Sequence, residues 1–320
     1  MKRWTVAALA VLLCFAGVAT ARAQTRAAHP DSARIVVSDV ANFWRAYDRL
    51  TPSLTRADSV RVLANEYIAH ASPGLQGYLE THLQKSENLL MGLGLLPRYM
   101  AAVRTNTLNI NPEAVRAALR RVEAFYSDAT YPDIYFVIAG FHSQGTVSRG
   151  NVVIAAEMVS ADAATPRGEL PPFLRGVDLT RAVLPCIMVH EMMHAQQNYQ
   201  ADRSLLAQVL VEGVADFITQ RAIGCVQTAA ATYEYGGAHE RELWLQFQRE
   251  MSGTDYSKWL YNGNTIKDRP DQLGYWMGYQ IAGAYYERAR DKQQAIRDLL
   301  HIQDYEAVLQ ASGYAQKFEK

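Results

Sequence analysis

Two histidines four residues apart, with a glutamate directly after the first, are the residues of this sequence best placed to do chemistry. They are His190, Glu191 and His194 in the stretch "HEMMH". Successive residues of an α-helix turn by about 100°, so both histidines would lie on one face and could bind one metal ion. Imidazole nitrogens suit Zn²⁺, and the glutamate would be near enough to act as general base toward a zinc-activated water. The alternative is two ordinary histidines on a helix surface.

A third ligand is available on the next predicted helix. A catalytic zinc needs three protein ligands and one open position. In the segment 205–222, Glu212 and Asp216 lie one turn apart on an otherwise apolar stripe. Burying two carboxylates is costly unless something pairs with them. We therefore expect Glu212 to bind the ion and Asp216 to accept a hydrogen bond from a ligand histidine. The alternative is two acidic side chains on a solvated edge.

A short link near residues 201–203 would fold these two helices into a hairpin. His194 and Glu212 would then face each other across it. The same hairpin would bring Cys186 toward Cys225, and an oxidising compartment permits a disulfide between them. Two buried thiols are the alternative, because the two arms of the hairpin differ in length.

The surrounding pattern predicts an α+β fold that is mostly helical. Segments 133–141 and 151–159 are rich in β-branched and aromatic residues, and the Gly- and Ser-containing segment 142–150 between them reads as a turn. We expect these two strands to form a small antiparallel sheet preceding the active-site helix hairpin. The alternative is that they are two neighbouring strands of a small sheet. Helical periodicity is found in the segments about 40–103, 111–126, 180–199, 204–223, 239–251 and 273–289.

The first 23 residues are typical of a cleaved signal peptide. Lys2 and Arg3 precede an apolar run over residues 6–18, and small residues at 21 and 23 suit cleavage after Ala23. The run is shorter than the about 20 residues of a membrane-spanning helix. An uncleaved anchor is the alternative. We expect a periplasmic or secreted bacterial protein.

After the signal, residues 24–38 are predicted to be a flexible leader and residues 39–320 a single metallopeptidase domain. That domain would have a helical N-terminal part, a zinc-binding core and a helical C-terminal part. Their expected bounds are 39–130, 131–225 and 226–320.

Charge argues against polyanionic partners. The chain has 32 basic and 32 acidic residues, and removing residues 1–23 takes away three basic residues and no acidic one, leaving a formal charge of −3. This balance gives no electrostatic reason to expect nucleic acid. No stretch after the signal is apolar enough for stable membrane insertion. The expected partner is a peptide or protein substrate.

The two motifs together resemble the gluzincin pattern, that of zinc metallopeptidases whose third ligand is a glutamate on the following helix. Three blocks, residues 134–158, 190–218 and 269–289, also resemble a bacterial family of predicted zinc-dependent proteases of unassigned function. That family is related to the gliding-motility lipoprotein GldB, and the resemblance covers about residues 40–315. It implies a zincin-like fold, with His190, His194 and Glu212 as zinc ligands and Glu191 as base. The chain lacks the lipoprotein cysteine of GldB, which argues against carrying over a gliding role.

The function we expect is therefore an exported zinc-dependent metallopeptidase that hydrolyses peptide bonds, with Glu191 as general base. Two alternatives stay open. One is a non-catalytic periplasmic binding or assembly factor on a gluzincin-like scaffold. The other is a zinc hydrolase that acts on a non-peptide amide or ester.

Candidates for a donor to the oxyanion come from the resemblance, because gluzincins commonly use a tyrosine or histidine for this. Tyr275 and Tyr279 lie one turn apart on a predicted late helix, and His239 is a further candidate. Aromatic packing is the alternative for both tyrosines. Glu157 lies on a strand that we expect at the edge of the sheet, where it could meet a substrate amine or face solvent or an arginine.

Overall fold

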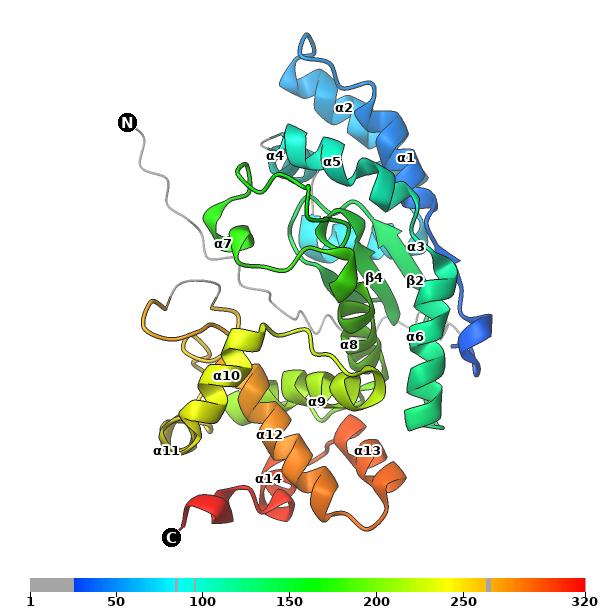
Figure 1. Ribbon diagram of the computed structural model, residues 1–320. Coiled ribbons are helices and arrows are strands. Elements are labelled where there is room, and N and C mark those ends of the chain that lie inside the picture. Colours follow the sequence, from blue (N-terminus) through cyan, green and yellow to red (C-terminus); the bar gives the residue numbers. More distant parts are fainter. Residues whose placement is uncertain (1–25, 84–85, 95, 263–265, 320) are drawn as a thin grey trace.

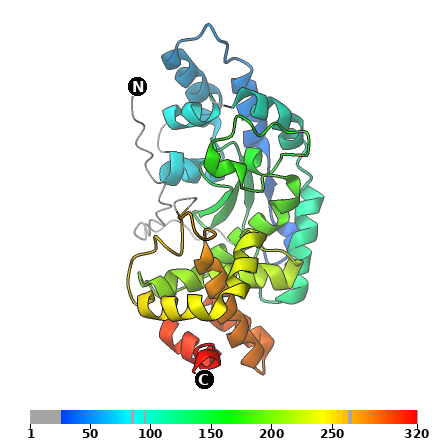
Figure 2. The same ribbon diagram turned by 60° about the vertical axis from the view of Figure 1, so that its left-hand side comes forward.

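A small sheet lies between two groups of helices in the computed structural model, which describes residues 26–83, 86–94, 96–262 and 266–319. Both views place the N-terminal helices at one end of the molecule and the C-terminal helices at the other (Figures 1 and 2). The predicted α+β class, mostly helical with one small sheet, is confirmed. The predicted signal peptide, residues 1–23, lies outside the described residues.

The sheet of the described residues has four strands in the order β1-β2-β4-β3. Their bounds are β1 Ile35–Val36, β2 Ile134–Val137, β3 Gly145–Ser148 and β4 Asn151–Ala155. Strands β1, β2 and β4 are parallel neighbours, and β3 pairs with β4 in the antiparallel sense. The sheet is therefore mixed.

The antiparallel direction predicted for segments 133–141 and 151–159 is wrong, because Ile134 lies opposite Val152 in a parallel register. The alternative, two neighbouring strands of a small sheet, is confirmed. The hairpin partner of β4 is β3, which lies within the segment interpreted as a turn. Its two-residue connection, Arg149 and Gly150, has positive φ at both positions, as a tight hairpin turn requires. A four-residue edge strand with Gly and Ser at its ends is too short to show a clear alternation of polar and apolar residues.

The segment predicted as a flexible leader, residues 24–38, belongs to the fold from Ala27 onward. The backbone of Ala27 exchanges two hydrogen bonds with Tyr131, of 3.0 and 2.9 Å. A 3₁₀ turn follows at Pro30–Ser32, and β1 then pairs with β2. Elements of two or three residues are too short to show a hydrophobic period in the sequence. Their backbone groups pair with residues about a hundred positions away, which no local pattern indicates.

The helices that precede α8 cover the sheet and one end of the molecule. They are α1 Ser38–Tyr47, α2 Arg56–Glu66, α3 Pro73–Tyr78, α4 Ser86–Leu93, α5 Pro97–Leu108, α6 Pro112–Phe125 and α7 Pro172–Arg175. Helix α6 begins where the Asn111 side chain accepts a hydrogen bond from the Glu113 backbone N–H at 2.9 Å. Figure 1 shows α6 beside the sheet, next to β2.

The second group of helices carries the predicted site. It comprises α8 Leu184–Gln196, α9 Leu205–Ile223, α10 Ala230–Ala238, α11 Glu240–Glu250, α12 Leu273–Arg288, α13 Lys292–Leu300 and α14 Tyr305–Ser312. The Ser204 hydroxyl caps the start of α9 and Gly224, with a φ of 84°, ends it. Within the described ranges, none of the helices combines the length and the hydrophobicity needed to cross a bilayer.

Helices α9 and α12 touch through their backbones. A Cβ atom on Gly213 would lie 2.2 Å from the carbonyl carbon of Gly278, and one on Gly278 would lie 1.9 Å from the carbonyl oxygen of Val209. Nothing larger than glycine fits at either position. Because Glu212 precedes Gly213, this contact also determines where that carboxylate lies.

Candidate metal centre

The predicted site residues come together between α8 and α9. His190, Glu191, Glu212 and Asp216 are all buried, and the side chain of His194 is 17% exposed. Helix α8 is apolar around nearly its whole circumference, so it lies in the core and takes its polar residues with it. The site is thus inside the protein, with His194 nearest to solvent.

Three side-chain atoms converge at distances that suit metal binding. His190 Nε2 and His194 Nε2 lie 2.9 Å apart, and Glu212 Oε2 lies 3.1 Å from His194 Nε2 and 3.4 Å from His190 Nε2. Ligand atoms of a tetrahedral zinc with bonds of 2.0–2.1 Å would be about 3.4 Å apart. The group His190, His194 and Glu212 can hold a metal ion.

In both histidines the ring proton lies on Nδ1, which leaves the Nε2 lone pair free. His190 Nδ1 lies 2.9 Å from Asp216 Oδ1, and His194 Nδ1 lies 2.8 Å from Gln197 Oε1. The Gln197 amide is oriented by its other end, which donates to the Val211 carbonyl. Both Nδ1 atoms therefore donate, as assigned from this hydrogen-bond network. The lone pairs of two imidazoles then face a carboxylate oxygen, and such a group repels itself unless a proton or a metal ion lies between. The donor set fits a metal.

The ionisation of these residues supports the same conclusion. Burial acts to lower the pKa of His190, but hydrogen bonds to Asp216 and Glu212 outweigh it and raise that pKa to about 10. Burial acts to raise the pKa of Glu212, but His194 and His190 hold it well below its usual range. Without a metal, the site therefore retains a proton among the three ligands, and metal binding releases it.

Glu191 lies against the edge strand β3. A Cβ atom on Gly145 would fall 2.7 Å from Glu191 Cγ and 3.1 Å from Glu191 Oε1. Gly145 at the start of β3 is thus what allows α8 to approach this strand. Burial raises the pKa of Glu191, and Glu212 adds to the rise while the two histidines oppose it.

The two predicted tyrosines are placed differently. The ring of Tyr275 is buried and nearly parallel to the His190 imidazole, with centroids 6.1 Å apart and planes at 25°. The Tyr279 hydroxyl donates to Gln220 Oε1 at 3.3 Å, and its ring packs edge-on against Phe217. Of the two, only Tyr275 contacts a predicted metal ligand through these interactions.

His239 lies outside the group that the structure brings together. Its ring stacks on Tyr235 with centroids 4.0 Å apart, and its Nδ1 donates to the Tyr235 carbonyl. It ends α10, and these contacts are those of a structural histidine.

Comparison with known protein families yields one match for this chain. A family model described as gliding motility protein GldB matches residues 104–316. The chain belongs to this family. The matched range includes the whole site, from α8 through α12. No curated protein and no solved structure matches the chain.

The description of the matched family is the only part of this comparison that concerns function. That description names a motility protein and no reaction. It supports the GldB part of the resemblance, whereas the gluzincin part rests on the spacing of residues 190–216. The predicted alternative of a binding or assembly factor therefore has more support from this comparison than a peptidase has.

Asp216 is the centre of a second layer of hydrogen bonds in this GldB-family chain. Besides His190, its carboxylate accepts the Tyr233 hydroxyl at 3.0 Å and the Gln227 backbone N–H at 3.2 Å. The predicted partnership of Asp216 with a ligand histidine is thus present. Tyr233 and Gln227 were not predicted, because they lie after the end of α9, where no periodic pattern points to the site.

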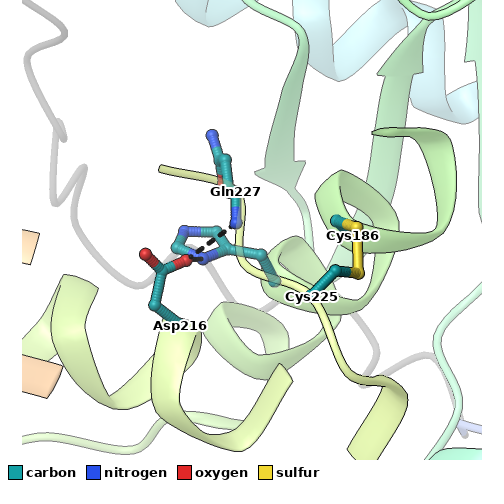
Figure 3. Close-up of a disulfide and its surroundings, with 5 residues drawn as sticks. Cys186, Asp216, Cys225 and Gln227 are labelled. Carbon is teal, nitrogen blue, oxygen red and sulfur yellow. Dashed lines mark hydrogen bonds and ion pairs between the residues drawn. A yellow bond between two sulfur atoms is a disulfide. The ribbon is translucent and has the colours of Figure 1, made fainter. Parts of the chain in front are cut away.

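The predicted disulfide is also present. Cys186 and Cys225 are bonded, with S–S 2.03 Å and Cα atoms 5.8 Å apart. The bridge joins α8 to the segment that follows α9, and Figure 3 shows it next to Gln227 and Asp216. The bond therefore ties down the segment whose backbone contacts Asp216.

A further contact of the site was missed from sequence. The Tyr261 hydroxyl donates to Glu212 Oε1 at 2.8 Å. Tyr261 lies between α11 and α12, in a segment rich in Gly, Asn and Pro that offers no pattern from which a site residue could be predicted.

The predicted position of Glu157 is wrong. Strand β4 is an inner strand between β2 and β3 and ends at Ala155. Glu157 lies beyond it, in the 3₁₀ turn Ala156–Met158, and its side chain is fully buried. Glu157 Oε1 accepts the backbone N–H groups of Ala139 and Phe141 at 2.9 and 3.2 Å. Burial raises the pKa of Glu157 to about 7. It supports the loop after β2 and faces neither solvent nor an arginine.

Proposed function

We propose that this protein is an exported zinc-dependent hydrolase of peptide bonds. The observation that carries the proposal is the convergence of His190 Nε2, His194 Nε2 and Glu212 Oε2 within 3.4 Å of one another. A site with a structural role alone would have no need of a buried glutamate, Glu191, beside the ligands. Export is supported by the Cys186–Cys225 bridge, because such bonds persist in oxidising compartments.

The donor chemistry favours zinc among the common metals. Two imidazoles and one carboxylate are typical ligands of catalytic zinc, whereas Ca²⁺ and Mg²⁺ prefer oxygen ligands. His190, His194 and Glu212 would hold the ion. When bound, zinc would supply Lewis acidity, which makes water a stronger acid and polarises the substrate carbonyl.

Glu191 is the residue proposed to move the proton. Its carboxylate is buried and its pKa is raised, so it can accept a proton from the attacking water and deliver it to the leaving nitrogen. Asp216 holds the His190 ring in the tautomer that presents Nε2. Tyr275, stacked on His190, is the better placed of the two tyrosines to approach a bound substrate.

The substrate is proposed to be an extended peptide that adds to β3. This strand has one partner among the described strands, β4, so its other edge is available for main-chain hydrogen bonds. β3 begins at Gly145, against Glu191. A peptide on this edge would pass beside the proposed base.

A second candidate is favoured by the family description, which names motility. It is a non-catalytic periplasmic factor that binds or assembles with other proteins. Under this proposal the metal, when bound, would stabilise α8 against α9, and no substrate would be turned over.

The first test is the metal content of the chain from residue 24 to 320, measured beside His194→Ala. About one zinc per chain, lost in the variant, is expected under the hydrolase proposal. Absence of zinc from both, even after incubation with zinc, would overturn it.

The second test separates the two candidates. Wild type and Glu191→Gln are incubated with a peptide library, and zinc content is measured in both. Hydrolysis by the wild type alone, with equal zinc in both proteins, is the expected result. Equal zinc with no hydrolysis by either would favour the binding factor, and full activity of Glu191→Gln would exclude the proposed base.

A further inference from the structure

The two oxygens of Glu212 have different partners. Oε2 faces the two imidazole nitrogens at 3.1 and 3.4 Å, on the side where a metal would lie. Oε1 accepts the Tyr261 hydroxyl at 2.8 Å. Glu212 is 4% exposed, so bulk solvent does not compete for either oxygen. The carboxylate is thus oriented with one oxygen toward the site and the other away from it.

Tyr261 is held in this orientation by its own backbone. Its φ is 55°, in the left-handed region that a bulky L-residue adopts only when the surrounding structure requires it. Gln272, at the other end of the connection to α12, has a φ of 61°. The Asn262 side chain accepts the Gln272 backbone N–H at 2.9 Å and so joins the two ends. Strained backbone is thus maintained at Tyr261, and the neighbouring Asn262 is tied to the start of α12.

We propose that Tyr261 is a positioning residue that keeps Glu212 a one-oxygen metal ligand. A carboxylate can bind a metal through one oxygen or both, and a catalytic zinc site must keep one position open. By occupying Oε1, the Tyr261 hydroxyl prevents Glu212 from rotating both oxygens toward the ion. The position that Oε1 would otherwise take stays available. This inference rests on the proposed metal site, and it does not depend on which reaction, if any, the site performs.

The test replaces the hydroxyl and reads out coordination directly. Tyr261→Phe keeps the ring and removes the bond to Oε1. Wild type and variant are loaded with Co²⁺, whose visible absorption per metal weakens as coordination rises from four to five or six. We expect weaker absorption in Tyr261→Phe, and an affinity that changes by roughly 10–100-fold, as for other residues that orient a ligand.

The matched control is Tyr314→Phe. Tyr314 donates to Glu240 Oε1 at 2.9 Å, so this variant also loses a partly buried tyrosine–glutamate hydrogen bond, between α11 and the C-terminal residues. Its Co²⁺ spectrum should match that of the wild type. If Tyr261→Phe does not fold, Asn262→Ala, which releases the backbone that aims Tyr261, should weaken the absorption in the same direction.

The outcomes distinguish this inference from the function on which it rests. A wild type that binds neither Co²⁺ nor Zn²⁺ overturns the metal site and the inference together. A wild type that binds Co²⁺, with the same spectrum and affinity in Tyr261→Phe, overturns the inference alone. Equal spectral changes in the Tyr261 and Tyr314 variants would assign the effect to general loosening of the fold and would also overturn it.

Discussion

At the scale of single residues, the candidate site depends on buried carboxylates whose partners determine what they do. Glu212 faces the imidazoles, and Asp216 orients one of them. The pKa of Glu191 is raised by burial and by Glu212, and is lowered only by the two histidines. Glu157 lies in another part of the core and accepts backbone N–H groups. All four carboxylates are buried, yet each has different partners.

Replacing Asp216 with alanine should weaken metal binding by roughly 10–100-fold, because the His190 Nδ1–H would lose its acceptor. The measurement is a competition titration with a metal-sensitive dye. Asp298→Ala is the control, since Asp298 also accepts a tyrosine hydroxyl, that of Tyr285, in a partly buried place away from the site. Unchanged affinity in Asp216→Ala would mean that this carboxylate does not orient a ligand.

Glu157 should make stability fall as pH rises. Burial raises its pKa from the ordinary 4.5 to about 7 in the folded protein, so the folded state favours the neutral carboxyl. The stability it contributes is fully present below pH 4.5 and is lost as pH rises through 7, by up to about 3 kcal/mol. Glu157→Gln stays neutral throughout. Urea unfolding should therefore show that the free energy of unfolding of the variant increases relative to that of the wild type between pH 5 and pH 8.

The control for that series is Glu169→Gln. Glu169 also accepts two backbone N–H groups, those of Arg98 and Tyr99, but is partly exposed. A difference between Glu157→Gln and wild type that stays constant with pH would show that Glu157 does not titrate in this range.

At the scale of elements, the site depends on how closely α9 approaches its neighbours. Its Gly213 meets Gly278 of α12 with no room for a Cβ atom on either side. On α8, Glu191 packs against Gly145 at the start of β3 with similarly little room. Glycines thus set the spacing between the elements that carry the ligands and the base.

Gly278→Ala should destabilise the fold by about 3 kcal/mol or more, because the new Cβ would lie 1.9 Å from the Val209 carbonyl oxygen and one helix must move. Gly283→Ala on the same helix is the matched control, since its Cβ would make an ordinary 3.5 Å contact with Phe217. That change should be neutral or slightly stabilising, because alanine favours helix. Chemical denaturation measures both. Similar losses in the two variants would contradict this account of the contact.

At the scale of the whole molecule, one covalent bond encloses the candidate metal centre. The Cys186–Cys225 bridge closes a segment with a sequence separation of 39, which contains both histidines, Glu191, Glu212 and Asp216. A cross-link of this span reduces the conformational freedom of the unfolded chain. It also fixes the residues beside Gln227 after α9 has ended (Figure 3).

Replacing both cysteines with serine should lower the free energy of unfolding by about 4 kcal/mol, from the loss of loop closure over this span. Thermal unfolding of the variant and of the reduced wild type should show the same loss. Metal affinity should fall with it, because the Gln227 backbone would no longer be held against Asp216. A variant as stable as the oxidised wild type would mean that this bond adds nothing to the fold.

Much of the candidate site could be predicted because its residues follow helical spacing. His190 and His194, and likewise Glu212 and Asp216, are one turn apart, so each pair shares a face wherever its helix is packed. Tyr233, Gln227 and Tyr261 could not be predicted, since they reach the carboxylates from separate segments. The parallel direction of the pairing between β2 and β4 could not be predicted either, because β3 lies in a segment that resembles a turn.

By itself, the sequence determined the mostly helical class, the group that could hold a metal ion and the carboxylate that orients His190, since these depend on contacts within one helix or between consecutive helices. The tertiary structure alone decided the mixed sheet, the burial of Glu157, the stacking of Tyr275 on His190 and the bond from Tyr261 to Glu212. The physical reason is that helical periodicity is a local property, fixed by backbone geometry over four residues. Strand register and contacts between distant segments depend on how the whole chain packs, and no short stretch of sequence encodes them.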